Sequence, residues 1–363
     1  MAPVVTALAR YAPEIETRVA FTGQHTTLVD QVLGAFDVEP AYDLELMREG
    51  QSLYDVVQGA LEGLRGVVRS FAPSMLLVQG DTASVFAGAL VGFFERVSVG
   101  HVEAGLRSGD MTAPFPEEGL RRLTDVVSTL RLAPTPRARD MLLAESVPAA
   151  SIHVTGNTVV DALLEIAEHD RPLRDPDLSR AIADGGRRLV LLTAHRRESF
   201  GAPLRDVFRA VRDLVDDVDD IDVIYPVHPN PRVREPAREM LSGHARIHLT
   251  APLDYFDLVS VLKRSALALT DSGGIQEEAP TFGTPVLVLR DVTERPEGIQ
   301  AGVSELVGTE PDRIVERARA LLARPRGPAP PNPFGDGRAG ERIADIVVAH
   351  LTGRGRTTVD WGG

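Results

Sequence analysis

Three acidic residues stand where apolar runs of the chain end, a position from which carboxylates can exchange protons with a ligand. Asp81, Glu103 and Glu117 lie in the segments Gly-Asp-Thr, His-Val-Glu-Ala-Gly-Leu-Arg and Pro-Glu-Glu-Gly-Leu-Arg. Carboxylates gathered in one cleft tend to include one with a raised pKa, which suits it to proton transfer. The structural alternatives are that Asp81 caps a helix and that Glu117 is a favourable charge at a helix N-terminus.

Metal binding is the other chemistry that this region suggests. His101 and Glu103 are two residues apart on an expected strand, so their side chains point the same way. No second His follows at the spacing of metal ligands, and the chain has no Cys. The sequence therefore favours proton transfer, and we predict no metal.

The segment Asp-Ser-Gly-Gly-Ile-Gln-Glu-Glu-Ala at 271–279 has the pattern of an anion site. It follows an apolar strand and continues as a helix, so several backbone N–H groups at the helix start lack a partner within the helix. After Ser272, the glycines Gly273 and Gly274 let a phosphate approach the backbone, and Glu278, one turn on, points toward whatever the phosphate carries. The alternative is an ordinary turn between a strand and a helix.

Basic residues after other strands supply the positive charge that a diphosphate requires. His195 and Arg196 lie in Ala-His-Arg-Arg-Glu-Ser-Phe-Gly, and His228 begins His-Pro-Asn-Pro. Arg295 follows the strand after the anion site, and its guanidinium can bind a phosphate or a carboxylate through two hydrogen bonds. The alternative for Arg196 and its neighbour is a solvated surface pair.

Short apolar runs that alternate with amphipathic helical stretches must position these residues. This alternation is typical of parallel sheets with helices on both faces, which places the chain in the α/β class. Ligands of such sheets bind beyond the carboxyl ends of the strands. The predicted strands are 18–21, 75–79, 97–101, 131–133, 152–155, 189–193, 222–227, 246–249, 266–270 and 285–289, and a final helix is predicted at 338–350.

Two lobes are expected, because 363 residues suffice for two cores and a stretch rich in Asp, Arg and Pro separates two series of strands. We predict an N-terminal lobe over 1–168, a linker over 169–188, a C-terminal lobe over 189–334, and a C-terminal helix and tail over 335–363. We expect the helix to pack back on the N-terminal lobe. The ligand is expected in the cleft between the lobes.

Composition limits the partners of the chain. The net charge of -13 argues against nonspecific binding to nucleic acid or to an anionic membrane. No apolar stretch is long enough for a membrane span, no signal peptide is visible, and the absence of Cys excludes disulfides, so we expect a cytoplasmic location. Small molecules are the expected partners.

Taken together, these segments resemble the non-hydrolysing UDP-N-acetylglucosamine 2-epimerase family over essentially the whole chain. TGNTVVDAL at Thr155 and NPFGDGRAGERI at Asn332 add to the resemblance. It implies an α/β fold of GT-B type, in which two Rossmann-like, doubly wound domains enclose the active site in the cleft between them. It also implies an isomerase that interconverts UDP-GlcNAc and UDP-ManNAc without a cofactor, by eliminating UDP to 2-acetamidoglucal and adding it back on the other face.

The resemblance also assigns roles to residues. It ties the acid/base steps to Asp81, Glu103 and Glu117, and it places Arg121 and His195 near the sugar and the diphosphate. It implies a homodimer and a place in cell-envelope polysaccharide or antibiotic amino-sugar synthesis. The residues that it implies for UDP binding are Arg196, His228, Ser272, Gly273, Gly274, Arg295 and, on the ribose hydroxyls, Glu278.

The chain departs from the family pattern in two places. It begins at Met1-Ala2-Pro3, the end of a GTRPEAIKMAP-like segment, so the first strand and its loop are missing and we expect a mis-assigned start. For a chain that is made this short, we predict weak activity or none. In the segment that regulates some family members, Gln24 and His25 match and Gln51 lies nearby, whereas Thr27 and Gly50 differ. Activation by the substrate is therefore not expected.

Other activities fit parts of the pattern. A GT-B glycosyltransferase would share the fold and the nucleotide site, although the three carboxylates favour proton transfer at the sugar. A hydrolysing epimerase would release UDP and free ManNAc, and other epimerases act on modified UDP-HexNAc sugars. A protein that binds nucleotide sugars without turnover is the non-enzymatic alternative.

Overall fold

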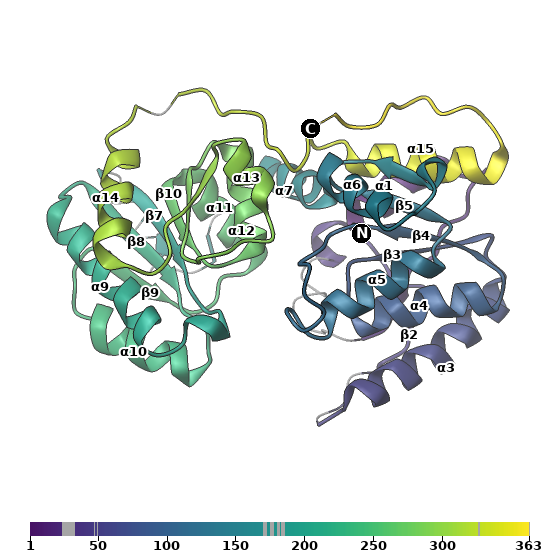
Figure 1. Cartoon of the computed structure of the whole chain (residues 1–363), viewed down its shortest axis with the longest axis horizontal. Helices are drawn as coiled ribbons and strands as arrows, with labels where there is room; N and C mark the ends of the chain where they lie inside the picture. Colours follow the sequence, from purple (N-terminus) through teal and green to yellow (C-terminus); the bar gives the residue numbers. More distant parts are fainter. Residues whose placement is uncertain are drawn as a thin grey trace. The chain divides into compact units, whose positions relative to one another are not determined.

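The computed structural model describes residues 1–23, 33–46, 48, 50–169, 173–174, 178–179, 182, 186–325 and 327–362. The chain forms two compact units (Figure 1). The first unit consists of Met1–Ala162 together with Phe334–Gly363, and the second consists of Leu163–Pro333. Each unit contains a parallel sheet and its own hydrophobic core.

The main sheet of the first unit has four parallel strands in the order β3-β4-β5-β6. They are β3 (Met75–Gln79), β4 (Ser98–Val102), β5 (Leu130–Ala133) and β6 (Ile152–Val154). A separate parallel pair joins β1 (Ala20–Phe21) to β2 (Tyr42–Asp43). Because the four strands run in the same direction, the residues that follow them gather along one edge of the sheet.

Capping side chains set where several helices of the first unit begin. Ser52 and Asp55 form a capping box at the start of α3, and Thr82 and Thr135 accept a backbone hydrogen bond at the starts of α4 and α6. The helix α7 continues from the first unit into the second. The helices are α1 (Ala2–Ala9), α3 (Leu53–Phe71), α4 (Ala83–Phe94), α5 (Glu117–Val127), α6 (Pro136–Ala144), α7 (Thr158–Glu168) and α15 (Ala339–Thr352).

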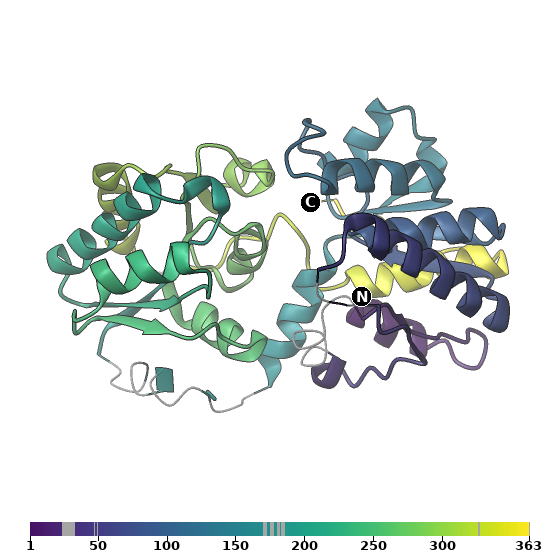
Figure 2. The same ribbon diagram turned by 90° about the horizontal axis from the view of Figure 1, so that it is seen from below.

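The C-terminal helix α15, drawn in yellow, belongs to the first unit (Figure 2). Its apolar residues share a buried cluster with those of α1. Asp161 caps the start of α15 by accepting hydrogen bonds from the backbone N of Ala339 at 3.2 Å and of Gly340 at 2.7 Å. Burial raises the pKa of Asp161 to about 6. The returning chain thus completes the core of the first unit.

The second unit has a six-stranded parallel sheet in the order β12-β11-β10-β7-β8-β9. Alternate residues of β7 enter different cores: Val190 and Leu192 pack with α9 and α14, whereas Leu189 and Leu191 pack with α11 and α12. Both faces of the sheet are therefore covered by helices. The strands are β7 (Arg188–Thr193), β8 (Ile221–Pro226), β9 (Ile247–Thr250), β10 (Ser265–Thr270), β11 (Val286–Val288) and β12 (Ser304–Leu306), and the helices are α9 (Ala202–Asp217), α10 (Pro231–Leu241), α11 (Tyr255–Arg264), α12 (Gly273–Glu278), α13 (Pro296–Gln300) and α14 (Pro311–Leu322).

The predicted α/β class is confirmed, and each strand predicted from the sequence has a counterpart whose ends lie within two residues of the prediction. The strands β2 and β12 were not predicted. They contain two and three residues, which is too short for an apolar alternation to be visible. The predicted final helix at 338–350 is α15, which extends to Thr352.

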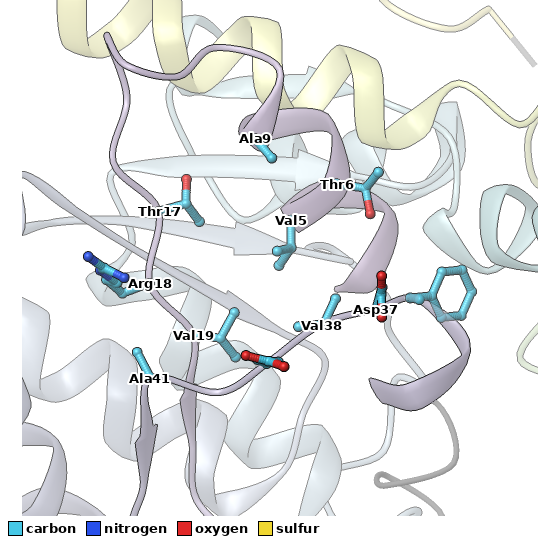
Figure 3. Close-up of a pocket in the computed structure, with 11 residues that line it drawn as sticks. Val5, Thr6, Ala9, Thr17, Arg18, Val19, Asp37, Val38 and Ala41 are labelled. Atoms are coloured by element: carbon cyan, nitrogen blue, oxygen red, sulfur yellow. The ribbon is translucent and has the colours of Figure 1, made fainter.

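A pocket of about 310 Å³ lies in the first unit, between α1, the chain that leads to β1, and residues 36–41 (Figure 3). Its lining includes Val5, Arg18 and Asp37, and it contains none of the site residues predicted from the sequence. Within the described part of the chain, no helix is both long and apolar enough to cross a membrane.

Candidate functional site

Glu103 occupies a strained turn at the end of β4. Its φ of 68° is uncommon for a residue with a side chain, and strain of this kind is concentrated at functional sites. The backbone N of Glu103 donates to the carbonyl O of Leu132 on the neighbouring strand β5 at 3.0 Å, which holds the turn. Gln79, the last residue of β3, donates from Nε2 to Oε2 of Glu103 at 3.4 Å. The strand ends thus hold this carboxylate at the edge of the sheet.

Asp81 is the second residue after β3 and follows Gly80, which has a φ of 86°. A Cβ atom on Gly80 would lie 3.9 Å from Oε2 of Glu103, so this turn is next to Glu103. Arg121 of α5 donates from Nη2 to Oδ2 of Asp81 at 2.6 Å. The structure therefore brings Asp81, Glu103 and Arg121 together at the end of the sheet.

Glu117 and Arg121 are four residues apart on α5, so they share one face of the helix. Oε2 of Glu117 and Nε of Arg121 are both buried, and neither atom has a hydrogen-bond partner among the residues that the structure describes. A buried polar atom without a partner costs free energy, and a bound ligand can remove that cost. This end of α5 thus has the polar atoms that a ligand would contact.

The adjacent Glu118 has a structural role that the sequence did not predict. It is fully buried and accepts hydrogen bonds from the backbone N of Ser108 at 3.0 Å and from Nε of Arg122 at 2.9 Å. Burial alone would raise the pKa of Glu118, but these hydrogen bonds and the charges of Arg121 and Arg122 hold the pKa below its usual range. Of the two glutamates, Glu117 is the one left for a ligand.

His101 of β4 and Asp125 of α5 form a buried hydrogen-bonded pair. Nδ1 of His101 lies 2.7 Å from Oδ1 of Asp125, and Nε2 lies 2.9 Å from the carbonyl O of Gly80. Arg107 donates to the other carboxylate oxygen of Asp125 at 2.7 Å and to Glu145 at 2.7 Å. Both ring nitrogens of His101 are therefore engaged within the fold. No group of three or more potential metal-ligating side chains occurs in the described ranges.

In the second unit, Asp271 fastens the loop after β7 to the end of β10. Its Oδ2 accepts hydrogen bonds from the backbone N of His195 at 2.6 Å and of Arg196 at 2.7 Å. The imidazole rings of His195 and His228 stack with their centres 5.6 Å apart. Burial, with the charges of His228 and Arg196, lowers the pKa of His195 in spite of the nearby Asp271 carboxylate. The structure thus groups His195, Arg196 and His228.

The predicted anion site is a turn that leads into the short helix α12. Ser272 precedes the helix, and Gly273 and Gly274 form its first turn. A Cβ atom on Gly273 would lie 3.1 Å from Cζ of Arg295, so the guanidinium packs directly against this glycine. Nε of Arg295 donates to Oε1 of Glu277 at 2.8 Å. Backbone N–H groups and a fixed cation therefore meet at the start of α12.

Glu278 is buried at the end of α12, where its side chain lies beside Tyr255 and Glu277. Burial and the charge of Glu277 raise the pKa of Glu278 to about 8. The hydroxyl of Tyr255 lies 3.5 Å from Oε1 of Glu278, and burial raises the pKa of Tyr255 as well. A buried acid of this kind can exchange hydrogen bonds with hydroxyl groups of a ligand.

The proposed regulatory residues are only partly visible. Gln24 and His25 lie outside the described residues. Gln51 accepts a hydrogen bond from the backbone N of Arg48 at 2.6 Å and donates to the carbonyl O of Leu46 at 2.8 Å. The amide of Gln51 therefore stabilises its own loop.

Sequence reasoning missed the residues that hold the others in place. Asp271 was part of the recognised segment, but its contacts with two backbone N atoms depend on the neighbouring strand β7. For Asp125 the sequence contained one indication. It follows Glu117 and Arg121 at intervals of four residues, which places all three on one face of α5. For Tyr255 the sequence contained none beyond its place at the start of α11.

The chain is similar to known proteins over almost its whole length. The sequence model of a family described as UDP-N-acetylglucosamine 2-epimerase matches residues 7–348. The UDP-N-acetylglucosamine 2-epimerase of Bacillus subtilis is 45% identical over 356 residues, which cover 96% of this chain and 92% of that protein. The enzyme of the same name from Escherichia coli K12 is 43% identical, with coverage of 96% and 94%.

A solved structure extends the comparison to the fold. The UDP-GlcNAc 2-epimerase from Neisseria meningitidis, determined with UDP-GlcNAc bound, matches with a TM-score of 0.86 and 38% identity. The match covers 98% of this chain and 96% of that one. It confirms the α/β fold of GT-B type expected from the sequence.

Proposed function

The chain belongs to the UDP-N-acetylglucosamine 2-epimerase family and is an isomerase of UDP-GlcNAc, and we propose that it inverts C2 by eliminating UDP and adding it back. The observation that carries this mechanism is the cluster at the end of the first unit's sheet, where Asp81, Glu103 and Arg121 lie together. There one oxygen of the Glu117 carboxylate has no hydrogen-bond partner among the described residues. Inversion at C2 requires removal of a proton from one face and its return to the other. A cluster of carboxylates offers such proton carriers.

The elimination step balances within the sugar nucleotide. The C2 proton moves to a carboxylate among Asp81, Glu103 and Glu117, the electron pair forms the C1=C2 bond, and the C1–O bond to UDP breaks. UDP leaves with the negative charge, so the intermediate is a neutral 2-acetamidoglucal. Addition reverses these steps after a proton has been delivered to the opposite face of C2, which gives UDP-ManNAc.

The second unit supplies the groups that stabilise the leaving UDP. Arg295, the backbone N–H groups of Gly273 and Gly274, and the hydroxyl of Ser272 suit the diphosphate, because hydrogen bonds to a charged group are stronger than those between neutral groups. The side chains of His195, Arg196 and His228 add further hydrogen-bond donors for the diphosphate of UDP. Glu278, protonated near neutral pH because its pKa is about 8, suits the ribose hydroxyls. UDP must stay bound between the two steps, since its loss would turn the reaction into hydrolysis.

The experiment that tests this function is incubation of the protein with UDP-GlcNAc in deuterated water, followed by proton NMR. We expect UDP-ManNAc to form, deuterium to enter C2 of both sugars, and free UDP not to accumulate. Accumulation of UDP with free ManNAc would identify a hydrolysing enzyme. Absence of both deuterium exchange and product would refute the proposed function.

We also propose that the protein is a homodimer that pairs through α3, α4 and α5. These neighbouring helices expose large apolar side chains. An exposed apolar surface of this kind marks a contact site. The side chains are Leu53 and Tyr54 on α3, Phe93 and Phe94 on α4, and Leu123 and Val126 on α5.

Light scattering after gel filtration tests the dimer. We expect twice the mass of 39.2 kDa for the wild type and a monomer for the double variant F94D/V126D. The matched variant V292D/V359D changes two exposed apolar residues elsewhere and should remain a dimer. A monomeric wild type would contradict the proposal.

A further inference from the structure

We propose that His101 is a positioning residue that is permanently held as an imidazolium and that joins the three segments carrying the proton-transfer groups. This inference rests on the proposed function, because it concerns how Asp81, Glu103 and Glu117 are held for the reaction. His101 itself lies in β4, is fully buried, and contacts none of these carboxylates in a hydrogen bond. Its role is therefore to place other groups rather than to touch the sugar.

The charge of His101 follows from its two partners. Nδ1 lies 2.7 Å from a carboxylate oxygen of Asp125, and Nε2 lies 2.9 Å from the carbonyl O of Gly80. A carboxylate and a carbonyl can only accept hydrogen bonds, whereas neutral imidazole has one donor and one acceptor nitrogen. Both contacts are satisfied together only when both ring nitrogens carry a proton.

The surroundings of Asp125 favour its ionised form. Its second oxygen accepts hydrogen bonds from Nη2 of Arg107 at 2.7 Å and from the backbone N of Gly105 at 3.3 Å. Burial would raise the pKa of Asp125, but the hydrogen bonds and charges of His101 and Arg107 hold it below its usual range. Arg107 also pairs with Glu145 at 2.7 Å, so one guanidinium joins the carboxylates of Asp125 and Glu145.

Two further cations lie at this cluster: Arg122, whose Nε is 3.8 Å from Glu145, and Arg131. The guanidinium of Arg131 donates to the backbone carbonyl O of Asp125 at 3.0 and 2.6 Å, and not to the carboxylate. Burial lowers the pKa of Arg131, against the attraction of Asp125. Arg131 therefore fixes the end of α5 without replacing His101 as the partner of Oδ1.

The contacts of His101 link three segments of the site. The first is the turn before Asp81, where His101 holds the carbonyl of Gly80 while the N–H of Gly80 donates to the carbonyl O of Val102 at 3.2 Å. The second is α5, on which Asp125 shares a face with Arg121 and Glu117. The third is β4, which leads directly into the strained Glu103, two residues after His101.

The protonation of His101 can be measured without any turnover. Two-bond proton–nitrogen correlation spectra of protein with labelled His, recorded at about pH 8, distinguish an imidazolium from a neutral ring, whose ordinary pKa is about 6.5. The spectrum of H101Q assigns the signal among the nine His residues. We expect both nitrogens of His101 to be protonated at pH 8. An unprotonated nitrogen would overturn the proposal, whatever the activity of the protein.

Kinetics test the positioning role with three variants. H101F removes both hydrogen bonds and should lower kcat about a hundred-fold, because small displacements of catalytic groups have effects of this size. D125N removes the charge of the pair but keeps the hydrogen bonds, since its amide can donate to Nδ1 of a neutral His101 ring and its oxygen can accept from Arg107, and it should lower kcat by about tenfold or less. H153F changes a half-buried His on β6 and is the control, with kcat expected to match the wild type.

A positioning role predicts a specific pattern in these measurements. KM for UDP-GlcNAc and the affinity for UDP should stay within about twofold in H101F, because the groups proposed to bind UDP lie in the second unit. A kcat of H101F close to that of the wild type would overturn the proposal. So would a D125N variant as impaired as H101F. A wild type that binds UDP but never epimerises would instead refute the proposed function alone, since the NMR result stands independently.

Discussion

Arg121 and Asp81 form an ion pair with 2.6 Å between Nη2 and Oδ2, which joins α5 to the turn after β3. The side chain of Arg121 is 10% exposed, whereas that of Asp81 is 32% exposed. Arg121 thus anchors the aspartate from the protein side while part of the carboxylate remains accessible. A second contact of Arg121, to Glu118 at 3.4 Å, fixes the guanidinium in turn.

Replacing Arg121 by Met should lower kcat/KM for epimerisation by about a hundred-fold, because the carboxylate of Asp81 loses the group that orients it. Steady-state kinetics with UDP-GlcNAc check this expectation. The control is R139M, which removes an exposed arginine of the same unit that pairs with its neighbour Asp140. Equal kinetics of R121M and R139M would show that the ion pair does not support the reaction.

Gly105 and Gly109 allow the effect of backbone strain to be separated from that of a steric clash. Both have a positive φ, 85° and 84°, so Ala at either position costs about 1 to 2 kcal/mol. A Cβ on Gly105 would also lie 2.3 Å from the carbonyl O of Ala138, whereas one on Gly109 meets nothing within 4 Å. In urea unfolding, G105A should therefore lose several kcal/mol of stability and G109A about 1 to 2 kcal/mol. Equal losses would contradict the clash.

The contact between Gly273 and Arg295 predicts how UDP binding responds to one added methyl group. A Cβ on Gly273 would lie 3.1 Å from Cζ of Arg295, which Glu277 holds in place, so G273A must displace the guanidinium. Calorimetry should show UDP affinity weakened by about tenfold or more, as expected when a charge-assisted hydrogen bond is lost. The control is G327A, because a Cβ on Gly327 would meet no atom within 4 Å. This variant should bind UDP like the wild type. Unchanged affinity of G273A would exclude Arg295 from the UDP site.

The raised pKa of Glu278 predicts a pH dependence of stability. Its folded-state pKa is about 8 and its ordinary value is 4.5, so between these values the native protein holds a proton that the unfolded chain releases. The stabilising contribution of Glu278 to the free energy of unfolding is therefore greatest below pH 4.5, and it is lost as the pH rises to about 8. E278Q mimics the protonated form and should not show this loss.

Urea unfolding at several pH values between about 5 and 9 measures the effect. The stability of E278Q relative to the wild type should increase by a few kcal/mol across this range. E239Q changes a glutamate in the same unit whose side chain is 62% exposed, and its difference from the wild type should stay constant with pH. A constant difference for E278Q as well would show that Glu278 titrates normally.

The sequence was sufficient to place the site residues at strand ends because two local patterns reinforce each other. An apolar run marks each strand, and Gly or a charged residue directly after it marks the edge where ligands bind. Asp81 after β3, Glu103 after β4 and the glycines after β10 were all found in this way. These are features of contiguous residues, which a single sequence contains.

The supporting contacts could not be predicted, because they join residues that are distant in the sequence. Which of Glu117 and Glu118 is buried depends on the backbone N of Ser108, whose position is set by the loop after β4. The partner of His101 is an aspartate twenty-four residues away, near the C-terminal end of α5. Local patterns contain no information about such pairs. Only the packing of α5 on the sheet creates them.

The return of the chain to the first unit has a topological consequence. The second unit is an insertion, because the first unit is interrupted after Ala162 and resumes at Phe334. The two ends of the interruption are close together, since the backbone N of Asn157, just before α7, donates to the carbonyl O of Phe334 at 2.7 Å. A single cut in either connection would therefore leave both units joined by the other. Release of the inserted unit requires two cuts, and a short peptide from Ala162 to Phe334 would close the first unit into one continuous chain.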